Sequence, residues 1–317
     1  MNRPIADLHC DLLCYLIGGE GSPRTAFDAQ VRCSIPQLKA GNVQTQVMAI
    51  FTETGPDSTR SGWAQAEMFQ QLPKQYPDAF PHLIKPLLAI ENASSFCDET
   101  EPLECGLKRL TILDQDVSKI IYLSMTWNTE NRFGGGAHTS IGLKEDGRRL
   151  LDFMNKKRIA IDLSHTSDAL AYGILNTIDQ YSLEIPVIAS HSNCRSIVSV
   201  ARNLPDELIR EIFRRNGVIG LNFIRDFVGK EDPLNFARHL EHFLKLGGEH
   251  HLCFGADFHY GNDVSPEFRK APENLFFPDY DHSGTYERLF ALWRKELQLD
   301  AMTASRIAHE NLSHFLE

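Results

Sequence analysis

The side chains best suited to bind a metal in this chain each follow a short apolar run. They are His9, Asp11, Glu91, His165 and His191. Neutral imidazole suits zinc and other borderline first-row metals, whereas Ca2+ and Mg2+ prefer sites rich in oxygen. Three imidazoles and two carboxylates therefore predict a site for two zinc ions with a bridging water or hydroxide. Glu91 must supply the protein bridge, because the fourth apolar run ends in Trp127 rather than in a lysine that could be carbamylated.

The spacing of His9 and Asp11 predicts that both side chains point to the same side, since side chains alternate along a strand. Cys10 should then point away. Taken alone, this pair is better explained as a histidine that caps a strand and an aspartate that starts a helix. Each of the other three residues also has an ordinary structural explanation in isolation. The metal site is favoured because all five are expected to converge.

A further carboxylate, Asp257, follows the last of the apolar runs. Two nearby cations would keep its pKa low, so that it would be ionised and could take a proton from metal-bound water. The structural alternative is that Asp257 caps the segment that follows it.

Eight short apolar runs rich in β-branched residues are expected to position these side chains, and helical patterns separate them. The runs span residues 5–9, 43–51, 86–91, 118–127, 158–164, 186–190, 217–223 and 251–257. This alternation predicts an α/β fold, a (β/α)8 TIM barrel, whose sites form at the carboxyl ends of the strands. Candidate ligands or titratable groups stand at five of the eight ends, which is more than chance would place there.

Helical periodicity predicts helices over residues 143–157, 206–216, 233–246 and 283–297, and a closing helix over 301–316. No shift in composition, linker or repeat divides the chain, so we expect a single domain over residues 1–317. Residues 52–85 and the glycine-rich stretch at 134–136 are most typical of insertions or lids.

The composition is that of an ordinary globular protein, with 42% hydrophobic and 23% charged residues. A net charge of −10 without a long basic run disfavours a nucleic-acid partner. The seven cysteines form no CxxC motif and suit a reducing compartment. Because the chain also lacks a signal-peptide pattern and an apolar stretch of ~20 residues, we expect a cytoplasmic protein with no membrane partner.

Short motifs stand at or near the predicted strand ends. They are Asp7-Leu8-His9-Cys10-Asp11-Leu12, Ile90-Glu91, Thr126-Trp127-Asn128, Asp162-Leu163-Ser164-His165, Ser190-His191-Ser192 with Arg202-Asn203-Leu204, and Gly255-Ala256-Asp257-Phe258. In combination and order they resemble the membrane (renal) dipeptidase family of the amidohydrolase superfamily. The motifs extend from residue 7 to residue 258, so the resemblance covers most of the chain.

The resemblance implies a zinc dipeptidase that hydrolyses the amide bond of dipeptides, including those with a D-residue at the C-terminal position. It places one zinc ion at His9 and Asp11 and the other at His165 and His191, with Glu91 between them. It also makes Asp257 the proton carrier.

The resemblance further implies that Arg202 contacts the substrate carboxylate; its structural alternative is an ion pair with Asp206 or Glu207. Two positions depart from the family pattern. Trp127 stands where the best-studied animal members have a substrate-contacting histidine, and His259 stands where an acidic residue is common. We expect Trp127 to form an apolar wall of the substrate pocket. His138 could return an imidazole to that pocket, the alternative being an ordinary exposed loop histidine.

Other functions are less well supported. A related hydrolase of another small amide or lactone would use the same metal pair. A deaminase is disfavoured, because the first run lacks His-x-His and no glutamate stands two residues after His191. The intact ligand set argues against a metal-free, non-catalytic binding protein. A cysteine hydrolase is disfavoured because Cys10 and Cys194 adjoin histidines with a better explanation. The sequence leaves open the side-chain preference, the native metal and whether the chain forms a homodimer.

Overall fold

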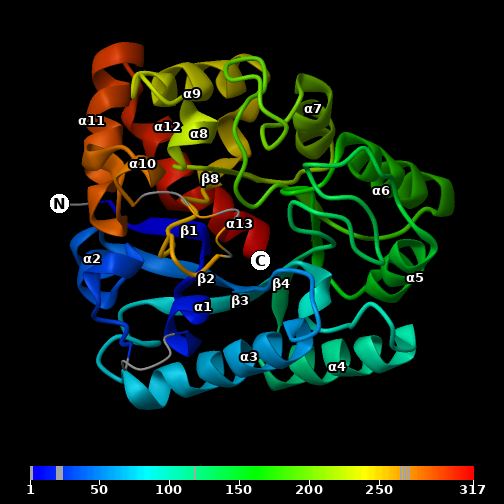
Figure 1. Cartoon of the computed structure of the whole chain (residues 1–317). Coiled ribbons are helices and arrows are strands. Elements are labelled where there is room, and N and C mark those ends of the chain that lie inside the picture. The colour runs from blue at the N-terminus through cyan, green and yellow to red at the C-terminus, as the bar shows by residue number, and fades with distance from the viewer. Residues whose placement is uncertain (1–2, 19–23, 118, 265, 267–268, 270–271) are drawn as a thin grey trace.

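A ring of eight parallel strands forms the centre of the molecule (Figure 1). The computed structural model describes residues 3–317 apart from 19–23, 118, 265, 267–268 and 270–271. The strands are β1 (Ile5–Cys10), β2 (Val43–Phe51), β3 (Lys85–Glu91), β4 (Ile120–Ser124), β5 (Ala160–Asp162), β6 (Val187–Ile188), β7 (Ile219–Leu221) and β8 (Leu252–Phe254). The eight predicted strands are confirmed, most of them shorter than expected. Ser118, where the fourth was expected to begin, lies outside the described residues.

The strands are hydrogen-bonded side by side in the order β6-β5-β4-β3-β2-β1-β8-β7. The two end strands meet through an isolated parallel bridge between Ala189 and Ile219. At this bridge the amide of Ala189 donates to the carbonyl of Val218 at 3.1 Å, and the amide of Gly220 donates to the carbonyl of Ala189 at 2.8 Å. The ring is thereby nearly closed, which confirms the predicted (β/α)8 barrel.

Helices surround the strands, and the last four of them follow β8 (Figure 1). They are α1 (Leu12–Ile17), α2 (Ile35–Ala40), α3 (Ser58–Gln75), α4 (Leu103–Asp116), α5 (Glu145–Met154), α6 (Asp168–Tyr181), α7 (Asp206–Arg214), α8 (Arg225–Val228), α9 (Asn235–Lys245), α10 (Pro272–Leu275), α11 (Tyr286–Leu297), α12 (Ala301–Ser305) and α13 (Asn311–Leu316).

The predicted helices correspond to α5, α7, α9 and α11. In α7 the apolar residues recur at helical spacing and all face the core: Leu208, Ile209, Ile212 and Phe213. The expected closing helix consists of α12, a π-helical turn at Arg306–Glu310 and α13. Asp300 starts it, because its side chain accepts hydrogen bonds from the amides of Met302 and Thr303, both at 2.9 Å.

The two segments expected to be insertions or lids have other roles. Residues 52–85 contain α3, the regular helix that connects β2 to β3. The glycine-rich stretch at 134–136 is buried, and Gly136 forms an antiparallel bridge with Thr166. A Cβ atom on Gly136 would lie 2.0 Å from the carbonyl oxygen of Trp127, so glycine is required for this close approach. The stretch is therefore a packed support for the loop that carries Trp127.

Small and apolar side chains fill the inside of the barrel. This inner cluster has members from seven strands and from the residue just before β7, and α13 contributes Leu312: Ala6, Leu8, Val47, Ala89, Ile121, Tyr122, Ala160, Ile188, Val218, Cys253 and Leu312. Phe315 and Leu316 pack against it from the same helix. The side-chain amide of Asn311 donates to the carbonyl of Leu252 at 2.8 Å. The C-terminal helix is thereby fixed to the amino end of β8.

Two glycines allow the last strands to approach each other closely. A Cβ atom on Gly220 or Gly255 would lie 2.0 or 1.9 Å from the carbonyl oxygen of Ser190. Any side chain at these positions would push β7 or β8 away from the end of β6. The polar residues that follow these strands depend on that spacing.

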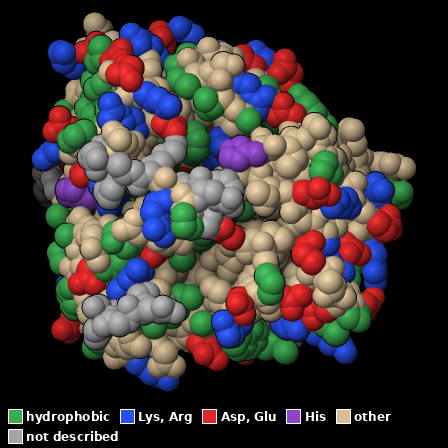
Figure 2. Space-filling model, viewed as in Figure 1, with side chains coloured by type: hydrophobic (Ala, Val, Ile, Leu, Met, Phe, Trp, Pro, Cys, Tyr) green, Lys and Arg blue, Asp and Glu red, His purple; other side chains and the backbone are tan. Residues whose placement is uncertain are grey.

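Among the described residues, no helix combines the length and the apolar character needed to cross a membrane. On the face shown in Figure 2, acidic and basic side chains are interspersed rather than gathered by sign.

Candidate metal centre

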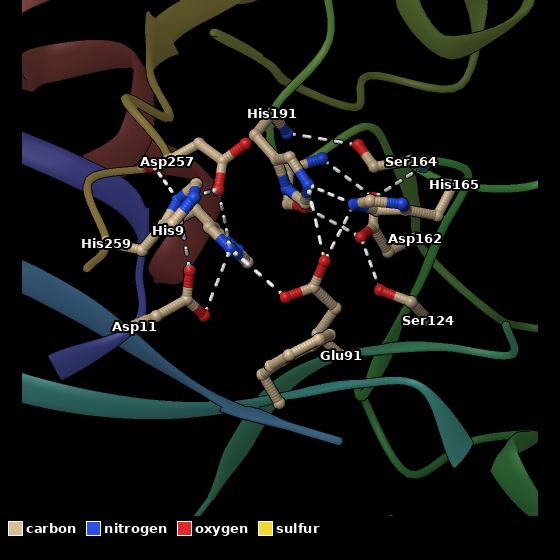
Figure 3. A network of polar contacts seen from close by, with 12 residues as sticks. His9, Asp11, Glu91, Ser124, Asp162, Ser164, His165, His191, Asp257 and His259 are labelled. Atoms are coloured by element: carbon tan, nitrogen blue, oxygen red, sulfur yellow. Dashed lines mark hydrogen bonds and ion pairs between the residues drawn. The ribbon is translucent and has the colours of Figure 1, made fainter. Parts of the chain in front are cut away.

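The polar residues predicted from the strand ends come together at the carboxyl end of the barrel (Figure 3). Each is at most 8% exposed: His9, Asp11, Glu91, His165, His191 and Asp257. A cavity of about 590 Å3 opens onto them and is lined in part by Asp11, Glu91 and Asp257. Burial of so many titratable groups is costly unless they are paired with each other or bound to cations.

The end of β1 directs its side chains as predicted, although by a less regular route. Nε2 of His9 lies 3.7 Å from Oδ1 of Asp11, so both face the centre. Asp7, which simple alternation would place on the same side, instead accepts a hydrogen bond from the hydroxyl of Tyr286 in α11. The pairing of β1 with β2 shifts register between Asp7 and Cys10. Such an irregularity re-aims a side chain at a strand end.

Glu91 lies between two groups of histidines. Its Oε2 atom is 3.4 Å from Nε2 of His9. Its Oε1 atom is 2.7 Å from Nε2 of His165 and 3.6 Å from Nε2 of His191. One carboxylate thus offers a different oxygen to each side, which is the arrangement expected of a residue that joins two cations.

Each imidazole has a partner on the nitrogen that faces away from the centre. Nδ1 of His165 lies 2.8 Å from Oδ1 of Asn128, which can only accept, so this nitrogen carries the proton. Nδ1 of His9 lies 2.6 Å from the hydroxyl of Tyr122 and Nδ1 of His191 lies 2.7 Å from Oγ of Ser190. When the Nδ1 atoms donate to these partners, the Nε2 lone pairs all face inwards, as metal ligation requires.

Several inward-facing atoms have no hydrogen-bond partner. Nε2 of His9 and Oδ1 of Asp11 are buried and unpaired in this sense. The Nε2 atoms of His165 and His191 lie 2.8 Å apart, so two lone pairs would face each other at that distance. Cations would satisfy all of these atoms, and the residues present therefore fit a metal site. Groups that could hold an ion are His9-Asp11-Glu91, Glu91-His165-His191, His9-His191-Asp257 and Asp11-Asp257-His259.

The carboxylates create a strongly negative environment. Burial alone would lower the pKa of His9, but the carboxylates of Glu91, Asp11 and Asp257 raise it to about 10. Burial raises the pKa of Asp11 to about 8. Burial would also raise the pKa of Glu91, but His9 and His165 hold it well below its usual value. This cluster therefore favours positive charge at its centre, whether carried by protons or by metal ions.

Asp257 is held at the edge of the centre by His259 and by Asn222, which the sequence did not single out. Asn222 donates its side-chain amide to Oδ2 at 3.0 Å. Nδ1 of His259 lies 3.5 Å from Oδ1 of Asp257 and 2.8 Å from the backbone oxygen of Asp257. Burial opposes ionisation, but His191 and His259 lower the pKa of Asp257. Asp257 is thus ionised at neutral pH and open to the cavity.

Left-handed backbone conformations occur at three of these strand ends. They belong to Asn92 (φ 76°), His165 (φ 65°) and Asp257 (φ 62°). Residues with side chains adopt such angles at a cost of order 1–3 kcal/mol, and they persist where the surroundings enforce them. The backbone is therefore strained next to the side chains that converge.

Arg202 lies beside the two histidines on the far side of Glu91. Its Nη2 donates to Nε2 of His165 at 3.0 Å, and its guanidinium lies 5.1 Å from the ring centre of Phe227. The side chain is 5% exposed, and its Nε is buried without a hydrogen-bond partner. Asp206, one of the expected alternative partners, instead contacts His242 and Ser196 at 2.8 and 2.7 Å. Arg202 thus faces the cavity rather than the helix that follows.

The two other predicted pocket residues also line the cavity. β4 ends at Ser124, so the expectation that Trp127 ends the strand is wrong; it lies in the following loop. Its ring contacts Phe51, with 5.3 Å between ring centres, and is 6.1 Å from His165. His138 is exposed at the cavity rim, and its amide donates to the carbonyl of Asn128 at 2.9 Å.

Comparison with known proteins gives a consistent result. The sequence model of the family described as "Membrane dipeptidase (Peptidase family M19)" matches residues 1–273. Dipeptidase verJ of Clonostachys rogersoniana is 32% identical over 143 residues, which are 43% of this chain and 36% of that protein. Another curated relative is matched over 52% of its length, so the chain spans about half or less of the curated relatives it matches.

Two solved structures share the fold over nearly the whole chain. One is described as "dipeptidase AC", a metallopeptidase of family M19, with 21% identity, a TM-score of 0.78 and coverage of 100% of this chain and 98% of the other. The other is a metallopeptidase from Rhodobacter sphaeroides bound to a phosphinate mimic of L-Ala-D-Ala, with 19% identity, a TM-score of 0.74 and coverage of 100% and 99%. At these identities the likeness shows a common fold.

Proposed function

The chain belongs to the membrane dipeptidase family, peptidase family M19, and on this premise we propose that it is a zinc-dependent dipeptidase. The observation that carries the proposal is the position of Glu91, whose two oxygens face His9 on one side and His165 on the other. We assign one ion to His9 and Asp11, a second to His165 and His191, and Glu91 to both. When bound, such ions would activate a water molecule and polarise the scissile carbonyl.

Asp257 is the proposed proton carrier. It is ionised, it lines the cavity, and Asn222 holds one of its oxygens at 3.0 Å. It would accept a proton from the attacking water and return it to the nitrogen of the leaving amine as the amide C–N bond breaks. Such a transfer needs a carboxylate fixed within hydrogen-bond reach of the reacting atoms, and the contacts to Asn222 and His259 supply that restraint.

Arg202 is the proposed group that binds the substrate carboxylate. Its Nη2 now uses the lone pair of His165 Nε2. That lone pair cannot serve both the guanidinium and a cation, so Arg202 has donors to offer when His165 is a ligand. A guanidinium holds a carboxylate through two parallel hydrogen bonds. If the scissile carbonyl lies at the metal centre and the terminal carboxylate at Arg202, a single residue would fit between them. The substrate would then be restricted to dipeptides.

The pocket walls support broad tolerance of side chains. Trp127 and Phe51 form an aromatic wall beside His165, and Phe227 lies under Arg202. The related fold from Rhodobacter sphaeroides holds a mimic of L-Ala-D-Ala, which supports including dipeptides with a C-terminal D-residue. His138 stands at the rim, and His138→Ala tests whether this imidazole contributes. Identical kinetics on every substrate would leave it an ordinary loop residue.

Screening of the zinc-loaded protein with matched substrates tests the proposal. The set comprises free L-L and L-D dipeptides, the same dipeptides amidated at the C-terminus, tripeptides and a small lactone, with a chelated sample as control. We expect hydrolysis of free dipeptides and poor activity on the amides and tripeptides. Equal cleavage of free and amidated dipeptides would contradict the role of Arg202. Activity confined to the lactone would contradict the dipeptidase itself and favour the related-hydrolase alternative.

We also propose that residues 1–317 form one domain and that the protein acts in the cytoplasm. All seven cysteines are free thiols, which suits a reducing compartment.

A further inference from the structure

A buried carboxylate next to the metal centre has no part in the mechanism above. Asp162 ends β5 and is completely buried. Its Oδ1 accepts from the amides of Ser164 and Ser190 at 3.0 and 2.7 Å. Its Oδ2 accepts from the hydroxyls of Ser124 (Figure 3) and of Ser190, both at 2.6 Å. Four donors on β4, β5 and β6 and their loops thus surround this carboxylate.

The contacts of Ser190 give this carboxylate a link to the metal centre. A carboxylate only accepts hydrogen bonds, so the hydroxyl hydrogen of Ser190 must point to Asp162. Oγ of Ser190 lies 2.7 Å from Nδ1 of His191. Because its one hydrogen is already used, Ser190 can only accept there, and Nδ1 of His191 must carry the proton. The lone pair of His191 is then on Nε2, which lies 3.6 Å from Oε1 of Glu91.

We propose that Asp162 is a positioning residue that acts through Ser190 to fix the tautomer and orientation of His191, and so raises the affinity of the cation on that side. The inference rests on the proposed function, since it assumes that His191 is a ligand. Groups that hold a ligating histidine from behind commonly change metal affinity 10–100-fold when removed.

The other two histidines have different direct partners on Nδ1, so the effect should be largest at His191. Nδ1 of His165 faces the neutral amide of Asn128, and Nδ1 of His9 faces the phenol of Tyr122. For His191 the chain of hydrogen bonds ends on a buried negative charge, which strengthens the imidazole as a ligand. Loss of Asp162 should therefore weaken the cation at His165 and His191 more than the cation at His9 and Asp11, which Ser190 reaches only through Tyr122.

Two serines provide a matched pair of variants. Ser124 and Ser190 are both fully buried, and both donate to the same oxygen of Asp162 at 2.6 Å. Of the two, Ser190 also contacts an imidazole, that of His191. Ser190→Ala and Ser124→Ala therefore remove the same group and the same bond to Asp162, and they differ in the links that Ser190 makes to His191 and to Tyr122.

The experiment titrates metal-free, full-length protein with Zn2+ in competition with a chelator. Ser190→Ala should weaken one of two binding events ~10–100-fold, whereas Ser124→Ala should stay close to the wild type. Asp162→Asn should resemble Ser190→Ala, and Ser190→Thr, which keeps the hydroxyl, should restore affinity. Melting curves of the metal-free variants show whether each is folded. If Asp162→Asn does not fold, the two serine variants still decide the question.

A second readout is the tautomer itself. 15N NMR of histidine-labelled, metal-free protein should show the Nδ1–H form of His191 in the wild type and in Ser124→Ala, but a mixture in Ser190→Ala. Equal loss of affinity in the two alanine variants, with an unchanged tautomer, would overturn the positioning role while the dipeptidase proposal stands. Wild-type protein that binds no cation would overturn the proposed function. A mixture of His191 tautomers in the wild type would overturn the positioning role.

Discussion

The two ends of the barrel are built in opposite ways. At the carboxyl end, buried carboxylates and imidazoles face each other, atoms such as Nε2 of His9 lack a hydrogen-bond partner, and Asn92, His165 and Asp257 adopt left-handed backbone angles. At the amino end, α13 inserts the fully buried Leu312 below an apolar inner cluster, with Phe315 and Leu316 against it.

This difference separates activity from stability within one scaffold. Unpaired polar atoms and strained backbone cost free energy, and they persist where they are needed and where packing elsewhere compensates. Close apolar packing supplies that compensation at about 25 cal/mol per Å2 of buried surface. Substitutions at the carboxyl end should therefore change catalysis and metal binding more than stability, and those at the amino end should do the reverse.

Asp257→Asn should give the largest effect at the carboxyl end. The amide is nearly the same size but cannot accept the proton, so kcat should fall ~10²–10⁴-fold while metal content and melting temperature stay close to the wild type. Steady-state kinetics and elemental analysis check this. Asp263→Asn is the control, since Asp263 lines the same cavity but is paired with Arg24. A normal kcat in Asp257→Asn would remove this residue from the mechanism.

Leu312→Ala should give the converse result at the amino end. Removing a fully buried leucine side chain leaves a cavity and should cost ~2–5 kcal/mol of the free energy of unfolding. The kcat/KM of the protein that remains folded should not change. Met302→Ala is the matched control, because Met302 on α12 is 60% exposed and should shift stability by no more than ~0.5 kcal/mol. Denaturant unfolding of both variants measures the difference. Equal losses of the free energy of unfolding would contradict the comparison between the two ends of the barrel.

Arg202→Ala should weaken binding rather than folding. Loss of one partner of a buried charge pair should cost ~2–5 kcal/mol in kcat/KM for free dipeptides, mostly through KM. Amidated dipeptides, which lack the carboxylate, should be affected much less. Arg202→Lys should recover part of the loss, because it keeps the charge but not the bidentate geometry. A loss of the same size on free and amidated substrates would argue for a structural role.

Protonation of His239 should lower the stability of the fold in acid, and it should do so without acting on the metal centre. Burial lowers its pKa from 6.5 to about 4, and its Nδ1 accepts from the amide of Cys194 at 3.2 Å. The unfolded chain binds this proton near pH 6.5 and the folded chain only near pH 4, so stability is complete above 6.5 and falls as the pH drops towards 4. The linked loss is roughly 3 kcal/mol at most.

Denaturant unfolding between pH 7 and pH 4 measures this effect. His239→Gln, which does not titrate, should have a shallower pH dependence than the wild type. Identical slopes for the two proteins would show that other groups cause the acid sensitivity.

The sequence predicted the barrel and the meeting of its polar residues because both follow local rules. Strand runs alternate with amphipathic helices such as α7, and parallel strands bring residues at their carboxyl ends together. The inward direction of His9 was also predicted. The register shift between Asp7 and Cys10 was not, because it depends on the pairing of β1 with β2, and neither was the contact of Asp7 with Tyr286.

The supporting residues could not be predicted for a similar reason. Asp162 and Ser190 each stand in a recognised motif, but the bond between them joins residues 28 apart and depends on how β5 and β6 are aligned. Tyr122 appeared only as one apolar residue of a strand, although its hydroxyl contacts His9. Trp127 was placed at a strand end because apolar residues continue past Ser124, where the ladder in fact stops.

The central claim is that one carboxylate, Glu91, holds two metal ions at the strained, polar end of the barrel. Metal analysis of gently purified wild-type protein and of Glu91→Gln, each after reconstitution with zinc, tests it most directly. We predict about two zinc ions per wild-type chain and reduced occupancy of both sites in the variant, since the change removes the shared ligand. One ion or none in the wild type, or two ions retained by Glu91→Gln, would contradict the account.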